Sequence, residues 1–157
     1  MALHDELKFR NPIRLLPHEV LLNVYYTASC IKKDASRFFR SFGLTDVQFN
    51  LMMLLKYQCA SDEGLTQALI SDMMLVNRAN ITTLVDRMVK ADLVVRLPDI
   101  QDRRANIIRL SPRGRDLLEQ VEPRYAEEIC RIMAMFSPEE QKKLIALLEQ
   151  VRGSINN

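Results

Sequence analysis

The chain has 157 residues, of which 48% are hydrophobic and 27% are charged, as is usual for a globular protein. That length predicts one domain that buries about two-thirds of the surface of its unfolded chain. No apolar run approaches the roughly 18 residues that a membrane-spanning helix needs, and the N-terminus is charged rather than apolar. These features exclude a membrane-embedded protein and predict a cytoplasmic one without a signal peptide.

The charge is small overall but unevenly distributed. The 22 basic and 20 acidic residues leave a formal net charge of +2. From Arg96 to Arg115, six arginines stand against two aspartates, which leaves +4 in this segment and −2 in the rest. A basic stripe on a near-neutral protein is typical of a phosphate-binding surface. A solvated charged face explains the same pattern equally well.

The cysteines, Cys30, Cys59 and Cys130, are far apart and odd in number, and the chain has only two histidines. No spacing among them suits zinc, so we expect neither a metal nor another cofactor. Buried structural thiols in a reducing compartment are the preferred interpretation, and a redox-sensing thiol is the alternative.

The first half of the chain is predicted to be helical. A helix over residues 17–43 has proline in its first turn and glycine at its C-terminal end. A capping box of Thr45 and Gln48 precedes a helix over 49–57 that is apolar almost all round and therefore predicted to be central.

Two short helices and a hairpin follow. Thr66 caps the first helix, within residues 65–74, and Asn77 caps the second, which reaches Asp92. Apolar runs at 93–97 and 105–110 are predicted to form a β-hairpin. This order predicts a winged helix-turn-helix, in a fold that is mainly α with a small β-hairpin wing.

The C-terminal part is predicted to hold two further helices. One runs from Ser111–Pro112 toward Met135, with a bend or local opening at Pro123. The last begins at a capping box of Ser137 and Glu140. No repeat or linker interrupts the chain, so we expect a single domain over residues 1–157.

The helix capped by Asn77 has two faces at 100° per residue. Ile81, Leu84, Val85 and Met88 form a core-facing stripe. Small and hydrogen-bonding side chains on the other side suit a helix that enters a major groove, and cations flank them for phosphate. The candidate DNA-binding residues of this helix are Asn77, Arg78, Ala79, Asn80, Thr82, Thr83, Arg87 and Lys90. A polar outer face is also what any surface helix shows, and Asp86 favours that alternative unless it is paired, for instance with Lys90.

The predicted hairpin tip explains the arginines of the basic stripe. A wing beside a groove-reading helix lies over the adjacent minor groove, where an arginine can read groove width. We expect Asp102 to orient Arg104, Arg104 to insert, Arg103 to contact phosphate, and Arg96 to belong to the same DNA-binding wing. The alternative is a solvated turn with a local ion pair worth about 0–1 kcal/mol.

The chain resembles the MarR family of bacterial transcriptional regulators in two runs, NRANITTLVDRMVKADLVVR and DIQDRRANIIRLSPRGRDLL. The family pattern has a capped, threonine-rich recognition helix, an L-V-x-R strand, a D-x-x-D-x-R wing and an L-T-x-x-G start to the next helix. The match covers about residues 65–118. Leu75 and Asp92 stand where the family usually has glycine, and an aspartate tolerates a left-handed backbone at modest cost. The cysteine that the peroxide-sensing branch keeps near the start of the first helix is absent from NPIRLLPHEV.

The resemblance implies a homodimer on a pseudo-palindromic DNA operator, and often autorepression. The winged-helix lobe would span about 45–110, and the dimerisation helices about 10–43 and 111–157. Apolar side chains near both ends support a dimer, although they could instead cover the chain's own core. These side chains are Ile13, Leu15, Leu16, Leu144, Leu147, Leu148, Val151 and Ile155.

Family members often bind a small aromatic or phenolic effector between the dimer helices and the DNA-binding lobe. The candidate pocket residues here are Arg14, His18, Tyr25, Tyr26, Phe49, Met52 and Met53. The alternative is that the aromatic and methionine residues simply belong to the core.

Two other function classes compete with a DNA-binding regulator. An enzyme is disfavoured, because the sequence has no glycine-rich phosphate loop, no HExxH motif and no plausible catalytic triad. A winged-helix adaptor that binds proteins instead of DNA is the stronger alternative, but it would not need the arginine-bearing tip.

Overall fold

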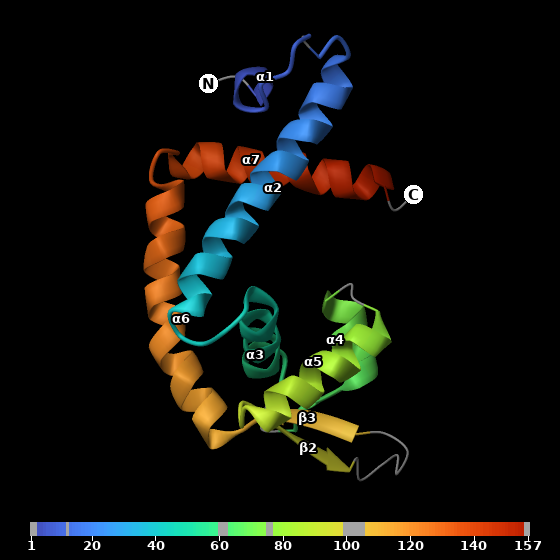
Figure 1. Ribbon diagram of the computed structural model, residues 1–157, viewed down its shortest axis with the longest axis vertical. Helices are drawn as coiled ribbons and strands as arrows, with labels where there is room; N and C mark the ends of the chain where they lie inside the picture. The colour runs from blue at the N-terminus through green and yellow to red at the C-terminus, as the bar shows by residue number, and fades with distance from the viewer. Residues whose placement is uncertain (1–2, 12, 60–62, 75–76, 99–105, 156–157) are drawn as a thin grey trace. The chain divides into compact units, whose positions relative to one another are not determined.

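The computed structural model describes residues 3–11, 13–59, 63–74, 77–98 and 106–155, and of Arg78 it describes the backbone alone. The described chain is mainly helical with a small antiparallel sheet, as predicted (Figure 1). The helices are α1 (Leu3–Glu6), α2 (Leu16–Arg40), α3 (Asp46–Gln58), α4 (Gln67–Met74), α5 (Arg78–Lys90), α6 (Pro112–Met133) and α7 (Pro138–Ile155). The strands are β1 (Leu65–Thr66), β2 (Val94–Pro98) and β3 (Asn106–Leu110). None of the described helices is long and apolar enough to cross a membrane.

The chain forms two compact units, Met1–Gly114 and Arg115–Asn157. In the first unit, α3 contacts α2, α4 and β3, while α5 contacts α4 and β2. Helix α3 therefore joins the long N-terminal helix to the helix-turn-helix and the sheet.

The core of the first unit is built around α3. Phe49 of α3 stacks on Phe39 of α2 with 4.4 Å between ring centroids, and Leu51 and Met52 are completely buried. Burying each such side chain stabilises the fold by about 1.5–3 kcal/mol. The prediction that this helix is central, made because it is apolar almost all round, is confirmed.

The predicted capping box at the start of α3 is also present. The backbone N–H of Gln48 donates to the hydroxyl of Thr45 (3.2 Å), and the N–H of Thr45 donates to the side-chain oxygen of Gln48 (2.9 Å). These bonds satisfy two amides that the helix cannot pair internally and set where α3 begins.

The sheet has the order β1-β3-β2 and contains a strand that the sequence pattern does not predict. Helical spacing places Leu65 at the start of a helix, but this residue pairs with Ile108 of β3 in β1. Gly64, at φ +79°, lets the backbone just before β1 approach Ile107 and Ile108 more closely than a side chain at this position would allow. This pairing is between distant segments, so local helical spacing could not reveal it.

The second unit contains α7 and all but the first turn of α6. Helix α6 continues through Pro123 without a break. The predicted capping box of α7 is confirmed: the N–H of Ser137 donates to Glu140 (2.8 Å), and the N–H of Glu140 donates to the Ser137 hydroxyl (3.3 Å). Hydrogen bonds from the backbone and then the side chain of Ser137 lower the pKa of Glu140. No residue of α7 is buried.

Candidate nucleic-acid interface

Helices α4 and α5 form the helix-turn-helix (Figure 1). A polar side chain caps the start of each helix. The N–H of Leu69 donates to the Thr66 hydroxyl (3.3 Å), and the N–H of Ala79 donates to the side chain of Asn77 (2.9 Å). Both predicted caps are therefore confirmed. Asn77 satisfies one of the first amides of α5, and the other N-terminal amides of this helix give it a partial positive charge suited to an anion.

The inner face of α5 is the predicted one. Ile81, Val85 and Met88 have no exposed surface, and Leu84 is half-buried. The helix lies against α4 on one side and β2 on the other, so its orientation is fixed by packing rather than by its own propensity. This packing holds the exposed outer face of α5 in a fixed orientation relative to α4 and β2.

The outer face of α5 carries the predicted contact residues. Exposed side chains there are Asn77, Ala79, Asn80, Thr82, Thr83, Arg87 and Lys90. The Thr83 hydroxyl donates to the carbonyl oxygen of Ala79 (3.2 Å). The side chain of Arg78 lies outside the described part. Small residues along the centre of this face let the helix backbone come close to a partner.

The basic side chains at the C-terminal end of α5 do not pair with Asp86, the acidic residue of the same helix. Asp86 accepts from Arg96 of β2 at 2.7 Å rather than from Lys90, the partner suggested by their i,i+4 spacing. Tertiary structure decides this choice, because β2 passes beside the helix and brings the guanidinium of Arg96 to the carboxylate. Within the described residues, neither Arg87 nor Lys90 has an ion pair, so both cations remain available for phosphate.

The hairpin is present, and its strands pair Val94 with Leu110 through to Pro98 with Asn106. The predicted ranges, 93–97 and 105–110, are each close to the observed strands. The tip, residues 99–105, lies outside the described residues. Asp102, Arg103 and Arg104 therefore stay predicted DNA contacts.

Several arginines of the basic stripe serve the fold itself. Arg109 donates to the carbonyl oxygen of Glu63 (3.1 Å), and Arg113 donates to that of Ala91 (3.2 Å). Together with Arg96, these side chains hold the hairpin, the loop before β1 and the C-terminal end of α5. Part of the stripe is thus explained by intramolecular bonds, which a count of charges could not distinguish from a DNA-binding surface.

The turn after α5 is hydrogen-bonded to the start of α6. Asp92 adopts φ +55°, and its carbonyl oxygen accepts from the buried hydroxyl of Ser111 (2.6 Å). The same hydroxyl accepts from the N–H of Gly114 (2.9 Å). The expectation that Asp92 can take the left-handed backbone of a glycine is confirmed. The sequence pattern identifies Ser111 only as a helix start and misses its hydrogen bond to Asp92. Its place as the second residue of the run from Leu110 to Gly114 is the available signal.

The candidate effector residues do not share one environment. Phe49 and Met52 lie in the core, at 2% and 0% exposure, and Met53 is half-buried. On α2 and the segment before it, Arg14, His18 and Tyr25 are exposed and Tyr26 is half-buried. For Phe49 and Met52 the core alternative describes their position, because both are buried and Phe49 stacks on Phe39.

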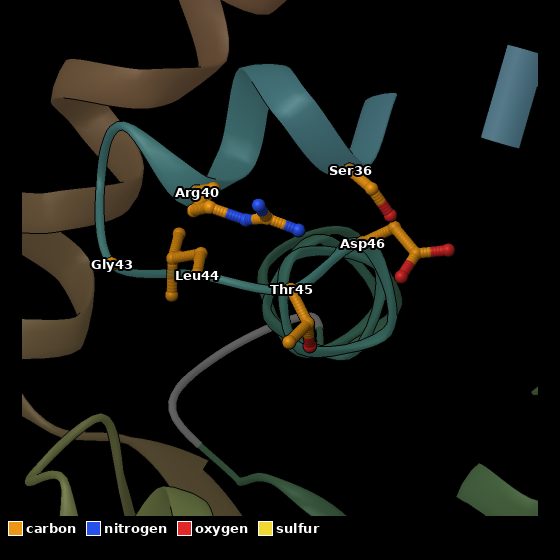
Figure 2. A pocket seen from close by; sticks show the side chains of 6 residues that line it. All are labelled: Ser36, Arg40, Gly43, Leu44, Thr45 and Asp46. Carbon is orange, nitrogen blue, oxygen red and sulfur yellow. The ribbon is translucent and has the colours of Figure 1, made fainter. Parts of the chain in front are cut away.

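A hollow of about 330 Å³ lies elsewhere, at the turn between α2 and α3 (Figure 2). Its lining residues are Ser36, Arg40, Gly43, Leu44, Thr45 and Asp46. Arg40 and Asp46 bring opposite charges to it, and both Thr45 and Gln48 are engaged in the capping box. The hollow therefore selects neither an anion nor a cation by charge.

The cysteines differ from expectation. Cys30 on α2 and Cys130 on α6 are exposed, and Cys59 is half-buried. The interpretation of buried thiols is wrong for Cys30 and Cys130, because each lies on an exposed face of its helix. In the described part of the chain, no group of three or more histidine, cysteine or acidic side chains could hold a metal ion.

Comparison with known proteins agrees with this geometry. A model of the MarR family matches residues 42–105, which begin in the turn after α2 and end just before β3. The chain is 27% identical over 121 residues to the HTH-type transcriptional regulator MhqR of Bacillus subtilis, covering 77% of this chain and 81% of that protein. It is 27% identical over 130 residues to the HTH-type transcriptional repressor YetL of the same organism, covering 83% and 77%.

Among solved structures, a complex of MepR from S. aureus with DNA superposes with a TM-score of 0.77 at 24% identity, over 85% of this chain and 96% of MepR. At that identity the likeness shows the shared fold. Helix order, caps, hairpin and relatives all lead to one conclusion: this chain belongs to the MarR family of winged helix-turn-helix transcriptional regulators.

Proposed function

We propose that this chain is a ligand-responsive repressor that binds a pseudo-palindromic DNA operator as a homodimer. The outer face of α5 carries the proposal, because its small and hydrogen-bonding side chains stand on a helix that is rigidly packed from behind. MepR, which shares the fold, has been solved in complex with DNA.

In this proposal α5 enters the major groove, which at about 12 Å is wide enough for a helix. Ala79 and Thr83 permit close approach, and Asn80 and Thr82 contact base edges, asparagine favouring adenine. Arg87, Lys90 and the N-terminal amides of the helix contact phosphate. The centre of α5 would therefore recognise the base sequence of the operator, and the phosphate contacts at its flanks would fix the position of the helix along the groove.

The hairpin tip acts in the neighbouring minor groove. Arg104 inserts, Asp102 holds its guanidinium before DNA arrives, and Arg103 contacts phosphate. Arginine in a narrow minor groove responds to groove width, so this contact would favour A/T-rich flanking sequence.

A second copy of the chain covers the apolar surface that one copy leaves exposed. On α7, Leu144, Ile145, Leu147 and Ile155 are 39–72% exposed. Before and within α2, Leu15, Leu16, Val20 and Leu21 are 44–70% exposed. Exposed apolar area of this extent is typical of an interface, and a two-fold dimer would present two α5 helices to two half-sites about one helical turn apart.

The effector in this proposal is a small aromatic or phenolic anion. The accessible candidates on and before α2 are Arg14, His18, Tyr25 and Tyr26, with Arg14 as the counter-charge and Met53 of α3 at the margin. Phe49 and Met52 would support the pocket from the core behind it. Such a ligand releases DNA only if it binds better to a form in which the two α5 helices no longer fit both half-sites.

Enrichment of a duplex from a random pool tests the proposal, followed by fluorescence anisotropy against a scrambled duplex over a salt series. We expect a site with two half-sites, bound at least a thousand-fold more tightly than non-specific DNA, as is typical of specific binding (about 10³ or more), and a steep loss of affinity with salt. Failure to enrich any sequence, with only weak and salt-labile binding, would favour the protein-binding adaptor.

A further inference from the structure

We infer that the Asp86–Arg96 ion pair positions the wing on the recognition helix for DNA binding, and that Arg96 acts through Asp86 rather than on phosphate. The inference rests on the proposed function and deepens it. It changes the expected role of Arg96, which the sequence pattern assigned to direct DNA contact.

The pair joins the two elements that must reach DNA together. Arg96 lies on β2, and its guanidinium donates to the carboxylate of Asp86 on α5 at 2.7 Å. The two residues are only ten positions apart, but the turn after α5 reverses the chain between them. Among the described residues this is the ion pair that links α5 to the hairpin.

Register explains why Arg96 faces the helix. Side chains two apart on a strand share a face, and Val94, which is 1% exposed, lies on the same face of β2 as Arg96. Helix α5 packs against β2. Arg96 thus lies on the same face of β2 as the buried Val94, but farther along the strand, where its guanidinium reaches Asp86.

The position of Asp86 on α5 explains what the pair orients. At 100° per residue, Asp86 falls on the outer face of α5, about 20° from Ala79 and on the side of Thr82. Arg87 falls on the opposite flank. The hairpin is therefore attached to the recognition face beside Ala79, and the angle between the hairpin and that face depends on this attachment.

Energetics favour positioning over direct contact. The side chains of Arg96 and Asp86 are 32% and 49% exposed, so the pair adds little to the stability of the fold. Moving Arg96 to a phosphate would exchange one charge-assisted hydrogen bond for another and would leave a carboxylate unpaired beside DNA. Keeping the pair intact neutralises the charge of Asp86 at the interface. It also holds the hairpin strands in position on α5 before DNA binds.

The experiment measures operator and non-specific affinity, by anisotropy over a salt series, for four proteins besides the wild type. These are Asp86→Asn, Arg96→Gln, the double variant, and Asp34→Asn as the matched control. Asp34 accepts from Arg37 on α2, also at 2.7 Å, so its variant removes the same charge from an ion pair remote from α5. Thermal unfolding of each protein checks that the fold is kept.

We expect each single variant, and the double variant, to lose about fivefold in operator affinity relative to the Asp34→Asn control, without additivity, as coupled pairs show. The double variant has the net charge of the wild type, so its salt slope should be unchanged. The affinity of the double variant for non-specific DNA should also be unchanged, because only the simultaneous fit of the helix and the hairpin to two grooves is impaired.

Two results would overturn the inference while leaving the proposed function in place. If the double variant lowers the salt slope by about 0.9, Arg96 contacts a phosphate itself. If Asp86→Asn binds the operator as well as, or more tightly than, Asp34→Asn, the carboxylate positions nothing. If the wild type binds no duplex specifically, the inference fails together with the proposed function.

Discussion

Gly114 shows how one residue fixes the approach of a helix to a neighbouring segment of backbone, here Leu93, the residue before β2. A Cβ on Gly114 would overlap the carbonyl oxygen of Leu93 well inside van der Waals contact. We expect Gly114→Ala to lower the free energy of unfolding by about 1–3 kcal/mol or more, as overpacking against a backbone does. Chemical denaturation followed by circular dichroism measures it.

Gly153 is the matched control, because nothing lies within 4 Å of the position that an alanine methyl group would take there, and it is also helical. Gly153→Ala should raise the free energy of unfolding by about 0.5–1 kcal/mol through the lower entropy of the unfolded chain. Equal effects at both positions would show that the contact with Leu93 is unimportant.

Arg104 is the residue on which the wing hypothesis depends. Arg104→Ala should keep the thermal stability of the wild type and weaken operator binding by about tenfold or more, because it removes the side chain expected in the minor groove. Anisotropy with the enriched operator measures the change. Arg113→Ala is the comparison at a stripe arginine whose hydrogen bond is internal; it should affect stability more than DNA binding. An unchanged affinity of Arg104→Ala would remove the wing tip from the mechanism.

At the scale of the element, helix α7 depends on its first turn. Hydrogen bonds from Ser137 lower the pKa of Glu140, so the ionised carboxylate is the form that the folded state favours. A carboxyl group with a lowered folded pKa contributes stability above its usual pKa, and that contribution is lost as pH falls through the lowered value. The stability of α7 should therefore decrease as pH falls below the usual pKa of a glutamate carboxyl group, about 4.3.

Glu140→Gln should remove this part of the acid dependence. The difference in unfolding free energy between wild type and variant should be largest near neutral pH and should shrink as pH falls through the carboxyl range. Denaturation over a pH series measures it, with Glu139→Gln, a neighbouring first-turn acid, as the control. A difference that stays constant with pH would contradict the role of the cap.

Elements differ in how well sequence predicts them. The helices and their caps at Thr45, Asn77 and Ser137 are predictable because a cap, a helical period and a C-terminal stop are local features. Strand β1 and the hydrogen bond from Ser111 to the carbonyl oxygen of Asp92 are not, because each depends on a segment that is distant in the chain.

At the scale of the whole molecule, the apolar face of α7 predicts self-association. Leu147→Glu places a charge in the exposed stripe and should convert a dimer to a monomer, with a loss of operator affinity because half-sites then bind separately. Sedimentation or light scattering measures the mass, and anisotropy measures binding.

Ala146→Glu adds the same charge on the opposite side of α7, where helical spacing places it away from the stripe. It should leave the dimer intact. Dissociation by both variants would indicate a general effect of charge on α7, and dissociation by neither would place the dimer interface elsewhere.

The helix-turn-helix, the hairpin, the two faces of α5 and the family resemblance can all be predicted from the amino-acid sequence, because they depend on periodicity, caps and spacing within short segments. The pairing of charged residues cannot be predicted in this way, because it depends on the folded chain. Asp86 binds Arg96 and not Lys90, and Arg109 and Arg113 hold backbone carbonyls rather than standing free. The physical reason is that a salt bridge or a hydrogen bond forms between groups that lie close together in the folded chain. Spacing along the sequence shows only which partners are near within one helix or strand.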